Sequence, residues 1–379
     1  DFVILYRMNT QSRAMEDLLR REGVAYKIVG GLKFYERKEI KDIISYLRLI
    51  QNPSDNLSLT RIINEPKRGI GKTSLDKITD LAIQNETSMY EIIKNGKGFI
   101  AALDQSGGSS SKTLKAYGIE ESEYNSEEEM FDLIHEMRKR VFTSKSFTSE
   151  HILGAILFER TMLSKVNGEF TADYLWNEKH IVSFLKVDKG LQEQKNGVKL
   201  MKEIPNLSEQ LEEAKAKNVF GTKMRSVIYE PNEEGIKEIV KQQFDFAKII
   251  CEAGLVPIIE PEVDINSPEK EKCEEILKRE VKNQLENWNQ DYKIMFKFTI
   301  PTIENHYLDL YNYECVVRIV ALSGGYDIEK ATELLSKNQK MIASFSRALL
   351  QDLNVHQTQE EFDQKLNDVI VKIYNASIM

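Results

Sequence analysis

The stretch IMFKFTIP, residues 294–301, places a lysine, Lys297, in the middle of an apolar run. Phe296, Phe298 and Ile300 lie close to it, and a run this short and apolar is typical of a strand buried on both faces of a sheet. A lysine in such a strand loses most of its hydration, which is unfavourable unless the amine is neutral or paired with an anion. The stretch therefore predicts a buried strand that carries an unusual amine.

Seven further apolar runs lie between residues 99 and 347, with amphipathic helical stretches between them. In chain order the eight runs are FIAALD, AILFE, VSFLKVD, FGTKMR, LVPIIEPEV, IMFKFTIP, VVRIVALSGG and IASFSR. Strands that alternate with helices imply βα units and a parallel sheet. Eight such units in about 280 residues predict an α/β protein with a (β/α)8 TIM barrel over residues 94–379.

Each predicted strand ends in polar or ionisable groups, and in such barrels the active site forms at the C-terminal ends of the strands. The groups are Asp104, Glu159, Lys186 with Asp188, Lys223 with Arg225, Glu260 with Glu262, Lys297, Ser323, and Ser346 with Arg347. Because loops are hydrated, one or two polar strand ends are ordinary. Hydration of loops does not explain a lysine inside an apolar strand such as that of Lys297. We therefore expect an active site at this end of the barrel.

The charged strand ends predict a nucleophilic amine. A desolvated lysine near another cation has a lowered pKa and attacks carbonyl carbons. Lys186 and Lys223 would lie in the same barrel mouth as Lys297 and supply that cation. Glu260 and Glu262 are two residues apart on one strand and point the same way, so they form a carboxylate pair suited to proton transfer and to holding the lysines.

A phosphate site is expected at the last two strands, its usual place in this fold. Glycines in Ser323-Gly324-Gly325 let a phosphate approach the backbone, and Ser346-Arg347 adds charge-assisted hydrogen bonds. A phosphate site, a nucleophilic lysine and further basic groups opposite suggest that the ligand is a sugar phosphate with a carbonyl group.

Residues from about 95 to 379 resemble class I fructose-bisphosphate aldolases of the short bacterial kind. The matching words, in order, are KGFIAALDQSGGSSSKTLKAYG, GAILFERTM, FLKVDKGL, FGTKMRS, LVPIIEPEV, KFTIPT, VALSGGY and IASFSRAL. The resemblance implies cleavage of fructose 1,6-bisphosphate to dihydroxyacetone phosphate and glyceraldehyde 3-phosphate in glycolysis and gluconeogenesis. Sugar phosphates are the implied small-molecule partners.

The resemblance also implies roles for single residues. Lys297 would form a Schiff base with the substrate ketone, Glu260 would be the general acid/base, and Asp104 would polarise the hydroxyl at the bond being cleaved. Lys223 would assist carbinolamine chemistry. The groups that would bind phosphates and hydroxyls are Lys186, Arg225, Ser323, Gly324 and Arg347, with Asp188 orienting Lys186. Tyr374 is a candidate mobile proton donor, although this C-terminal tail differs from that of the longer aldolases.

No metal or other cofactor is expected, since a protonated imine would serve as the electron sink. The five histidines are scattered and form no ligand motif. The three cysteines, Cys251, Cys273 and Cys315, are widely spaced, which fits a reducing compartment and neither a disulfide framework nor a zinc site. No apolar run is long enough for a membrane span, and DFVILYR does not read as a signal peptide, so we expect a cytoplasmic protein.

The first ninety-five residues follow a different pattern, α/β and then helical. DFVILYR and AYKIVGG are strand candidates, while SRAMEDLLRREG, ERKEIKDIISYLRLI and SLDKITDLAIQ are helix candidates. The word KRGIGKTS, residues 67–74, ends like a phosphate-binding P-loop, whose first glycine would fall at position 66. Pro66 stands there, without an N–H group to donate, and no hydrophobic strand precedes it. We therefore do not interpret the word as a nucleotide site.

Residues 1–93 resemble superfamily-1 DNA helicases of the PcrA/UvrD type. The resemblance rests on LYRMNTQSR, IVGGLKFYERKEIKD and LSLTRIINEPKRGIGKTSLDKI, which follow one another in order. It implies contacts of Arg7 and Asn9 with single-stranded DNA, and of the turn Gly69–Gly71, beside Lys72 and Thr73, with duplex phosphates. The P-loop, the acidic Mg²⁺ motif and the arginine finger of that family are missing from the sequence. The segment is therefore predicted to be a partial helicase-like piece without motor function.

Charge is unevenly distributed along the chain, which fits two soluble domains of different pI as well as it fits a first part that contacts a polyanion. Residues 1–95 carry 16 basic and 13 acidic side chains, and subtraction from 52 and 60 leaves 36 and 47 for the remainder, a net charge of −11. The first part therefore tolerates a polyanion, and the second is a poor general binder of nucleic acid. An alternative is a DNA-binding module whose barrel is a passive scaffold. The complete set of strand-end residues argues against it.

Overall fold

A computed structural model of the chain describes residues 3–4, 9–27, 38–51, 56–66, 94–106 and 108–379. The chain divides into two compact units, Asp1–Pro66 and Lys67–Met379. Residues 67–93 lie outside the described residues, so the predicted domain boundary between residues 93 and 94 stays a prediction.

The second unit is the predicted barrel. Eight strands pair in parallel in the order β1-β2-β5-β7-β8-β9-β10-β11. They are β1 (Phe99–Leu103), β2 (Ile152–Leu157), β5 (Val182–Lys186), β7 (Gly221–Ile228), β8 (Val256–Val263), β9 (Ile294–Thr299), β10 (Val316–Leu322) and β11 (Met341–Ala343). The N–H of Ala102, in the first strand, donates over 3.1 Å to the carbonyl of Phe345, two residues beyond the end of the last strand. All eight predicted strands are confirmed.

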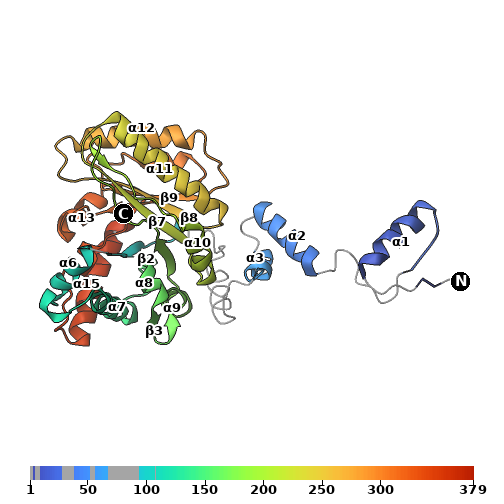
Figure 1. The fold of residues 1–379 in the computed structure, drawn as a ribbon, viewed down its shortest axis with the longest axis horizontal. Helices are drawn as coiled ribbons and strands as arrows, with labels where there is room; N and C mark the ends of the chain where they lie inside the picture. Colours follow the sequence, from blue (N-terminus) through green and yellow to red (C-terminus); the bar gives the residue numbers. More distant parts are fainter. Residues whose placement is uncertain (1–2, 5–8, 28–37, 52–55, 67–93, 107) are drawn as a thin grey trace. The chain divides into compact units, whose positions relative to one another are not determined.

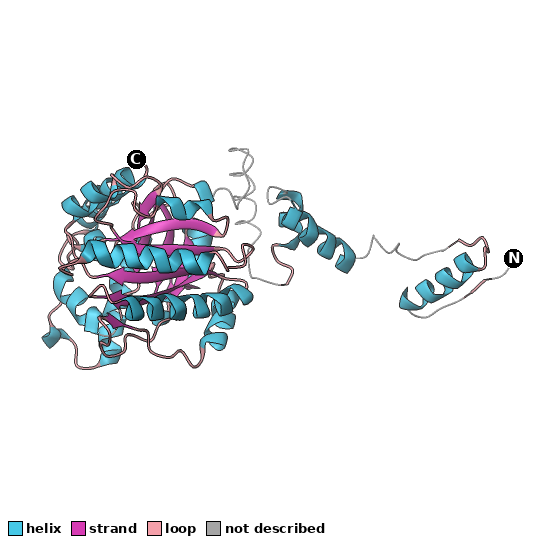
Figure 2. Ribbon diagram, turned by 90° about the horizontal axis from the view of Figure 1, so that it is seen from above, coloured by secondary structure: helices cyan, strands magenta, loops and turns pink. Residues whose placement is uncertain are grey.

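Helices surround the strands, as Figure 2 shows from above. They are α6 (Gly108–Tyr117), α7 (Glu127–Thr143), α8 (Glu159–Leu163), α9 (Thr171–Lys179), α10 (Leu207–Ala216), α11 (Glu233–Glu252), α12 (Lys270–Leu285), α13 (Ile328–Leu335), α14 (Arg347–Leu350) and α15 (Gln359–Ser377). The connection from β9 to β10 departs from simple alternation, because it holds the 3-10 helix η3 (Leu308–Asn312) instead of an α-helix. Shorter elements are the 3-10 helix η2 (Glu121–Glu123), the hairpin of β3 (Lys165–Val166) with β4 (Glu169–Phe170), and β6 (Val198–Lys199), antiparallel to β7.

Strand β9 shows how the sequence directs side chains inward or outward. Phe296 and Phe298 belong to the core between the sheet and the helices, and their rings stack with centroids 5.2 Å apart. Met295 belongs to a second cluster, which fills the inside of the barrel. Because side chains alternate along a strand, Lys297 points inward one step beyond Met295. The same alternation directs Glu260 inward on β8, beyond Ile258.

The N-terminal end of the barrel is filled by aromatic side chains. Phe184 and Phe220 meet edge to face, with ring centroids 5.6 Å apart. A side chain on Gly221 would lie 2.9 Å from the Phe184 ring and 2.1 Å from the carbonyl oxygen of Val256, so glycine is required there. Polar groups of the barrel interior therefore gather at the other end, where the strands finish.

The first unit, Asp1–Pro66, is helical in its described residues. It contains α1 (Asn9–Arg21), α2 (Lys38–Gln51) and α3 (Asn56–Ile62) (Figure 1). Gly23, with φ of +68°, follows α1 as predicted for a helix C-terminus. The two predicted strands and the helix SLDKITDLAIQ fall largely or wholly outside the described residues. Helix α3 confirms that no buried strand runs up to Pro66.

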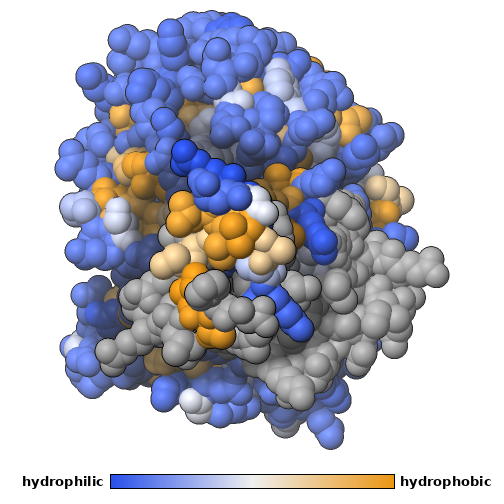
Figure 3. Space-filling view, turned by 90° about the vertical axis from the view of Figure 1, so that its right-hand side faces the viewer, coloured by the Kyte–Doolittle hydropathy of each residue, from blue (hydrophilic) through white to orange (hydrophobic). Residues whose placement is uncertain are grey.

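Helix α2 leaves much of its apolar face uncovered. Ile43, Leu47 and Ile50 are 57%, 59% and 79% exposed, although their spacing is that of a core-facing stripe. Figure 3 shows apolar side chains gathered at the surface. An apolar face of this kind normally packs against another element, so its exposure fits a piece of a larger fold.

Candidate active site

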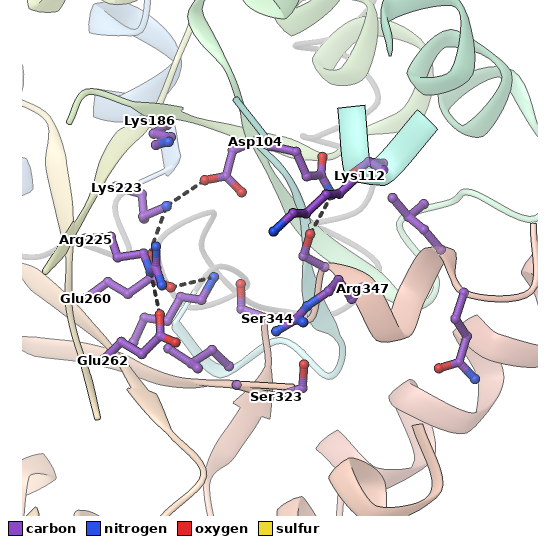
Figure 4. A pocket seen from close by; sticks show the side chains of 18 of the residues that line it. Asp104, Lys112, Lys186, Lys223, Arg225, Glu260, Glu262, Ser323, Ser344 and Arg347 are labelled. Carbon is purple, nitrogen blue, oxygen red and sulfur yellow. Dashed lines mark hydrogen bonds and ion pairs between the residues drawn. The ribbon is translucent and has the colours of Figure 1, made fainter. Parts of the chain in front are cut away.

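A cavity of about 510 Å³ opens at the C-terminal ends of the barrel strands. Of the predicted site residues, those that line it are Asp104, Lys186, Lys223, Arg225, Glu260, Glu262, Lys297, Ser323, Gly324, Ser346 and Arg347. In Figure 4, Lys186, Lys223, Arg225, Glu260 and Glu262 face Lys112, Ser323, Ser344 and Arg347 across the space. The strand ends thus bring together side chains that are up to 243 positions apart in sequence, from Asp104 to Arg347.

Four buried charged groups form a continuous chain at the base of the cavity. Lys223 Nζ lies 2.6 Å from Asp104 Oδ2 and 2.9 Å from Glu260 Oε2. Glu260 Oε1 lies 3.1 Å from Lys297 Nζ. Lys223, Glu260 and Lys297 are each 3% exposed, so each ion depends on the next for compensation.

Mutual attraction favours the ionised forms of Asp104, Lys223 and Glu260 despite burial. Burial favours the neutral acid, but the ammonium groups of Lys223 and Lys297 hold the pKa of Glu260 below its ordinary value. The pKa of Asp104 is lowered in the same way, against burial, chiefly by Lys223. Burial would lower the pKa of Lys223, but Asp104 and Glu260 raise it well above its usual value.

The partners of the two glutamates differ from those expected. Glu260 pairs with lysines, as predicted, whereas Glu262 Oε2 accepts a 2.5 Å hydrogen bond from Arg225 Nε. The predicted carboxylate pair is therefore two separate ion pairs that share one strand. Lys223 was expected to be a cation next to Lys297. It pairs instead with Asp104 and Glu260, and the charged group in contact with Lys297 is Glu260.

Strands β8 and β9 separate where these groups meet. Their backbone register runs through Ile258↔Met295 and Ile259↔Phe296. Beyond it, the buried Thr299 hydroxyl accepts from the N–H of Val263 at 3.0 Å and donates to its carbonyl at 2.6 Å. A side chain thus replaces the backbone ladder and holds the two strands around Glu260 and Lys297.

The other two predicted residues, Asp188 and Gly325, are not part of the cavity lining. Asp188 Oδ1 is 3.6 Å from Lys186 Nζ, which also donates to Ser106 Oγ at 2.6 Å. Gly325 is not part of the lining, but a Cβ atom on it would lie 3.4 Å from Arg347 Nη2. Gly324 has a φ of +62°, in the left-handed region that favours glycine.

Tyr374 lies away from this cavity. Its ring meets that of His151 edge to face, with centroids 4.6 Å apart, and His151 directly precedes β2. Tyr374 therefore lies at the N-terminal end of the strands, opposite the cavity. Tyr374 is not part of the cavity lining, and its predicted role as a mobile proton donor stays a prediction.

Sequence reasoning missed several residues of the cavity wall, among them Gln105, Lys112 and Ser344. Lys112 comes from α6, which begins at Gly108 directly after the first strand end. The small-residue run GGSSS before Lys112 was the available signal, because it lets a helix start beside the cavity.

The predicted DNA contacts stay predictions. Arg7, Gly69, Gly71, Lys72 and Thr73 lie outside the described residues, and Asn9 is the first residue of α1.

Three further findings concern cofactors, redox state and membranes. In the described part of the chain, no group of three or more His, Cys, Asp and Glu side chains is arranged to hold a metal ion. The three cysteines are free. Among the helices of the described ranges, none is both long enough and apolar enough to span a membrane.

Known proteins of two families resemble this chain. Fructose-bisphosphate aldolase class 1 of Clostridium acetobutylicum is 58% identical over 294 residues, which are 78% of this chain and 99% of that protein. The solved structure of fructose-bisphosphate aldolase from Plasmodium falciparum is 22% identical, covers 80% of this chain and 95% of that chain, and has a TM-score of 0.61, which confirms the barrel fold. A family model described as the UvrD-like helicase C-terminal domain matches residues 1–373. The chain therefore belongs to the class 1 fructose-bisphosphate aldolase family and, as expected of a chimera, also to the UvrD-like helicase C-terminal domain family.

Proposed function

We propose that the barrel catalyses the reversible aldol cleavage of fructose 1,6-bisphosphate to dihydroxyacetone phosphate and glyceraldehyde 3-phosphate, through a Schiff base on Lys297. The observation that carries the proposal is the buried chain Asp104–Lys223–Glu260–Lys297 at the base of the cavity. The 58% identical relative, a class 1 fructose-bisphosphate aldolase, supports the same reaction. A place in glycolysis and gluconeogenesis, in the cytoplasm, follows from this activity.

The proposed reaction starts with a proton transfer at Lys297. Lys297 Nζ gives a proton to Glu260, 3.1 Å away, and the neutral amine attacks C2 of the ketose. Glu260 returns that proton to the carbinolamine oxygen, which leaves as water while Lys223 stabilises the charge that develops, and a protonated imine remains. Asp104 accepts the proton of the C4 hydroxyl as the C3–C4 bond breaks, and the bonding electrons move to the imine nitrogen. This scheme uses no metal, because the protonated imine is the electron sink.

Release of the second product reverses these steps. Glyceraldehyde 3-phosphate leaves with the aldehyde formed at C4. The proton that Asp104 accepted passes by way of Lys223 to Glu260, which gives it to C3 of the enamine on Lys297. Water then hydrolyses the imine to free dihydroxyacetone phosphate. Glu260 thus acts as base and as acid in turn, which its contact with both lysines supports.

An excess of positive charge suits a substrate with two phosphate groups. The cavity lining includes six basic side chains, Lys112, Lys186, Lys223, Arg225, Lys297 and Arg347, and three acidic ones, Asp104, Glu260 and Glu262. We assign the phosphates and hydroxyls to Arg347, Ser323, Gly324, Ser346, Arg225 and Lys186. Asp188 would orient Lys186. Gly325, which has no side chain, would leave room for Arg347.

The helicase likeness is best assigned to the part of the chain ahead of the barrel. The family match extends to residue 373, whereas the helicase-like words end by residue 93 and β1 begins at Phe99. We therefore propose residues 1–93 as a partial helicase-derived segment and residues 94–379 as the aldolase. Weak DNA contact by Arg7, Asn9 and the turn Gly69–Gly71 belongs to this proposal. A passive scaffold would have no use for a chain of four buried ions, which argues against the alternative.

A coupled-enzyme assay of the full chain with fructose 1,6-bisphosphate tests the proposed activity. We expect cleavage by the native protein and none above background by Lys297→Met, because methionine retains the volume of the side chain and lacks the amine. Cleavage by the folded Lys297→Met variant at a rate near that of the native protein would overturn the proposal.

A further inference from the structure

Arg138, on α7, is a buried cation just behind the cavity wall. It is 1% exposed, and of the described residues none offers a carboxylate within 4.0 Å of it. Its Nη1 donates to Thr161 Oγ1 at 2.6 Å, and its Nη2 donates to the carbonyl and to Oε1 of Gln105 at 2.7 and 3.0 Å. Neutral acceptors alone therefore surround this guanidinium.

A buried charge without a counter-ion is unfavourable, so its retention calls for a reason. Burial lowers the pKa of Arg138 to about 10, although the negative charge of Asp104 acts in the opposite direction. Arg138 therefore stays positive at neutral pH. It holds a positive charge behind a cavity that our proposed function fills with phosphate dianions.

Arg138 fixes the orientation of Gln105, because a guanidinium only donates hydrogen bonds. Gln105 Oε1 must face Arg138, so its amide nitrogen must face the other way. That nitrogen donates to Ser346 Oγ over 2.5 Å. Gln105 and Ser346 both line the cavity.

The hydroxyl proton of Ser346 is directed in turn. Ser346 Oγ accepts from Gln105, so its own proton is free for another acceptor, and the described residues show no acceptor for it. Ser346 directly precedes Arg347, whose side chain reaches into the cavity in Figure 4. The relay from Arg138 through Gln105 thus presents an O–H donor beside a guanidinium, which matches the oxygen atoms of a phosphate group.

We propose that Arg138 is a positioning residue for phosphate binding in the aldolase cavity. Through Gln105 it makes Ser346 a hydrogen-bond donor toward the substrate phosphate, and the phosphate supplies the anion that Arg138 lacks. This inference rests on the proposed function for the identity of the substrate. The relay itself acts on any phosphate dianion that enters the cavity.

The decisive variant is Gln105→Glu in the full chain. A carboxylate would still accept from Arg138, and would pair with its charge, but it would also accept from Ser346 and turn that proton away from the substrate. We expect KM for fructose 1,6-bisphosphate and the dissociation constant of inorganic phosphate, measured by calorimetry, to rise about 10- to 100-fold. We expect kcat to change by less than about threefold, because the four-ion chain is untouched.

Three further variants complete the test. Arg138→Met should raise the same two constants, and in a Ser346→Ala background Gln105→Glu should have little further effect, because both act through one hydroxyl. Arg160→Met is the matched control: Arg160 is exposed on α8, stacks on Phe131 at 4.4 Å, and should leave both constants unchanged.

Two results would overturn the inference. One is a folded Gln105→Glu variant with native KM and native phosphate affinity. The other is additivity of Gln105→Glu with Ser346→Ala. If Arg138→Met does not fold, Gln105→Glu decides alone. Calorimetry with phosphate needs no turnover. Failure of the native protein to cleave fructose bisphosphate would therefore count against the proposed function, but not against the role of Arg138 in positioning Gln105 and Ser346.

Discussion

Glu260 touches both lysines of the buried chain, and in the proposed mechanism this position would allow one carboxylate to serve two proton transfers. Its two oxygens meet different amines, at 2.9 Å for Lys223 and 3.1 Å for Lys297. In that mechanism a proton that leaves Lys297 reaches a carboxyl group that stays in contact with Lys223. The same carboxylate is then placed to return a proton to the enamine on Lys297.

Replacement of this carboxylate should separate binding from cleavage. In Glu260→Gln we expect imine formation on Lys297 to persist while cleavage slows about 10²- to 10⁴-fold, the usual worth of a positioned acid/base. Single-turnover kinetics with fructose 1,6-bisphosphate measure the cleavage step. Glu262→Gln is the control, since Glu262 pairs with Arg225, and near-native cleavage by Glu260→Gln would transfer the role to Asp104 or Glu262.

The buried ions also predict a dependence of stability on pH. The folded-state pKa of Asp104 lies below its unfolded value of about 3.9, so its contribution to stability is complete above about pH 5 and is lost as the pH falls through the folded pKa. The advantage of the native protein over Asp104→Asn in free energy of unfolding should therefore shrink steadily as the pH falls below about 5. Denaturant unfolding at several pH values measures this. An advantage that grows as the pH falls would contradict the assignment of charges.

At the scale of elements, the contact between strands β8 and β9, here called the seam, shapes the site. The backbone ladder pairs these strands only as far as Ile259↔Phe296, and the Thr299 hydroxyl then takes both hydrogen bonds of Val263. Glu260 and Lys297 follow directly after the last backbone pair of the two strands, and both point into the barrel interior.

Removal of the Thr299 hydroxyl should disturb both stability and catalysis. Thr299→Val leaves the buried N–H and carbonyl of Val263 without partners, so we expect a loss of about 2–4 kcal/mol in the free energy of unfolding and a lower kcat. Thr332→Val is the control, since the Thr332 hydroxyl donates to carbonyls of its own helix, and its effect should stay below about 1 kcal/mol. Equal losses in the two variants would show that the seam has no special role.

The elements also show which features the sequence could predict. All eight strands were predictable, because parallel strands buried on both faces appear as continuous apolar runs. The inward direction of Lys297 followed from alternation along β9. The partner of each ion was not predictable, since pairing of Glu262 with Arg225 depends on rotamers at a strand end. Arg138 was hidden for a similar reason: in the word MRKRV three basic residues follow one another, and nothing in the sequence tells which one points inward.

At the scale of the whole molecule, the barrel holds every described residue of the cavity within one unit. Arg318 Nη2 donates to the carbonyl of Gly96 at 3.1 Å, which ties the chain to the barrel just before β1. The residues of the first unit, by contrast, leave the apolar face of α2 exposed. We therefore expect that the barrel needs no part of the first unit for catalysis.

Truncation tests this independence. A version that begins at Glu91 keeps Gly96, and we expect it to match the full chain in kcat and KM for fructose 1,6-bisphosphate. Neither version should show DNA-stimulated ATP hydrolysis, because the sequence lacks a P-loop and an acidic Mg²⁺ motif. DNA-stimulated ATPase activity of the full chain would contradict this account, and so would a loss of aldolase activity in a truncated protein with native thermal stability.

The most direct test of the central claim, a Schiff base on the buried lysine, is chemical trapping. Borohydride added together with dihydroxyacetone phosphate should reduce the imine, inactivate the protein irreversibly and leave one mass adduct, which peptide mapping locates on Lys297. An adduct on another lysine, or full activity after borohydride treatment with the substrate present, would contradict it.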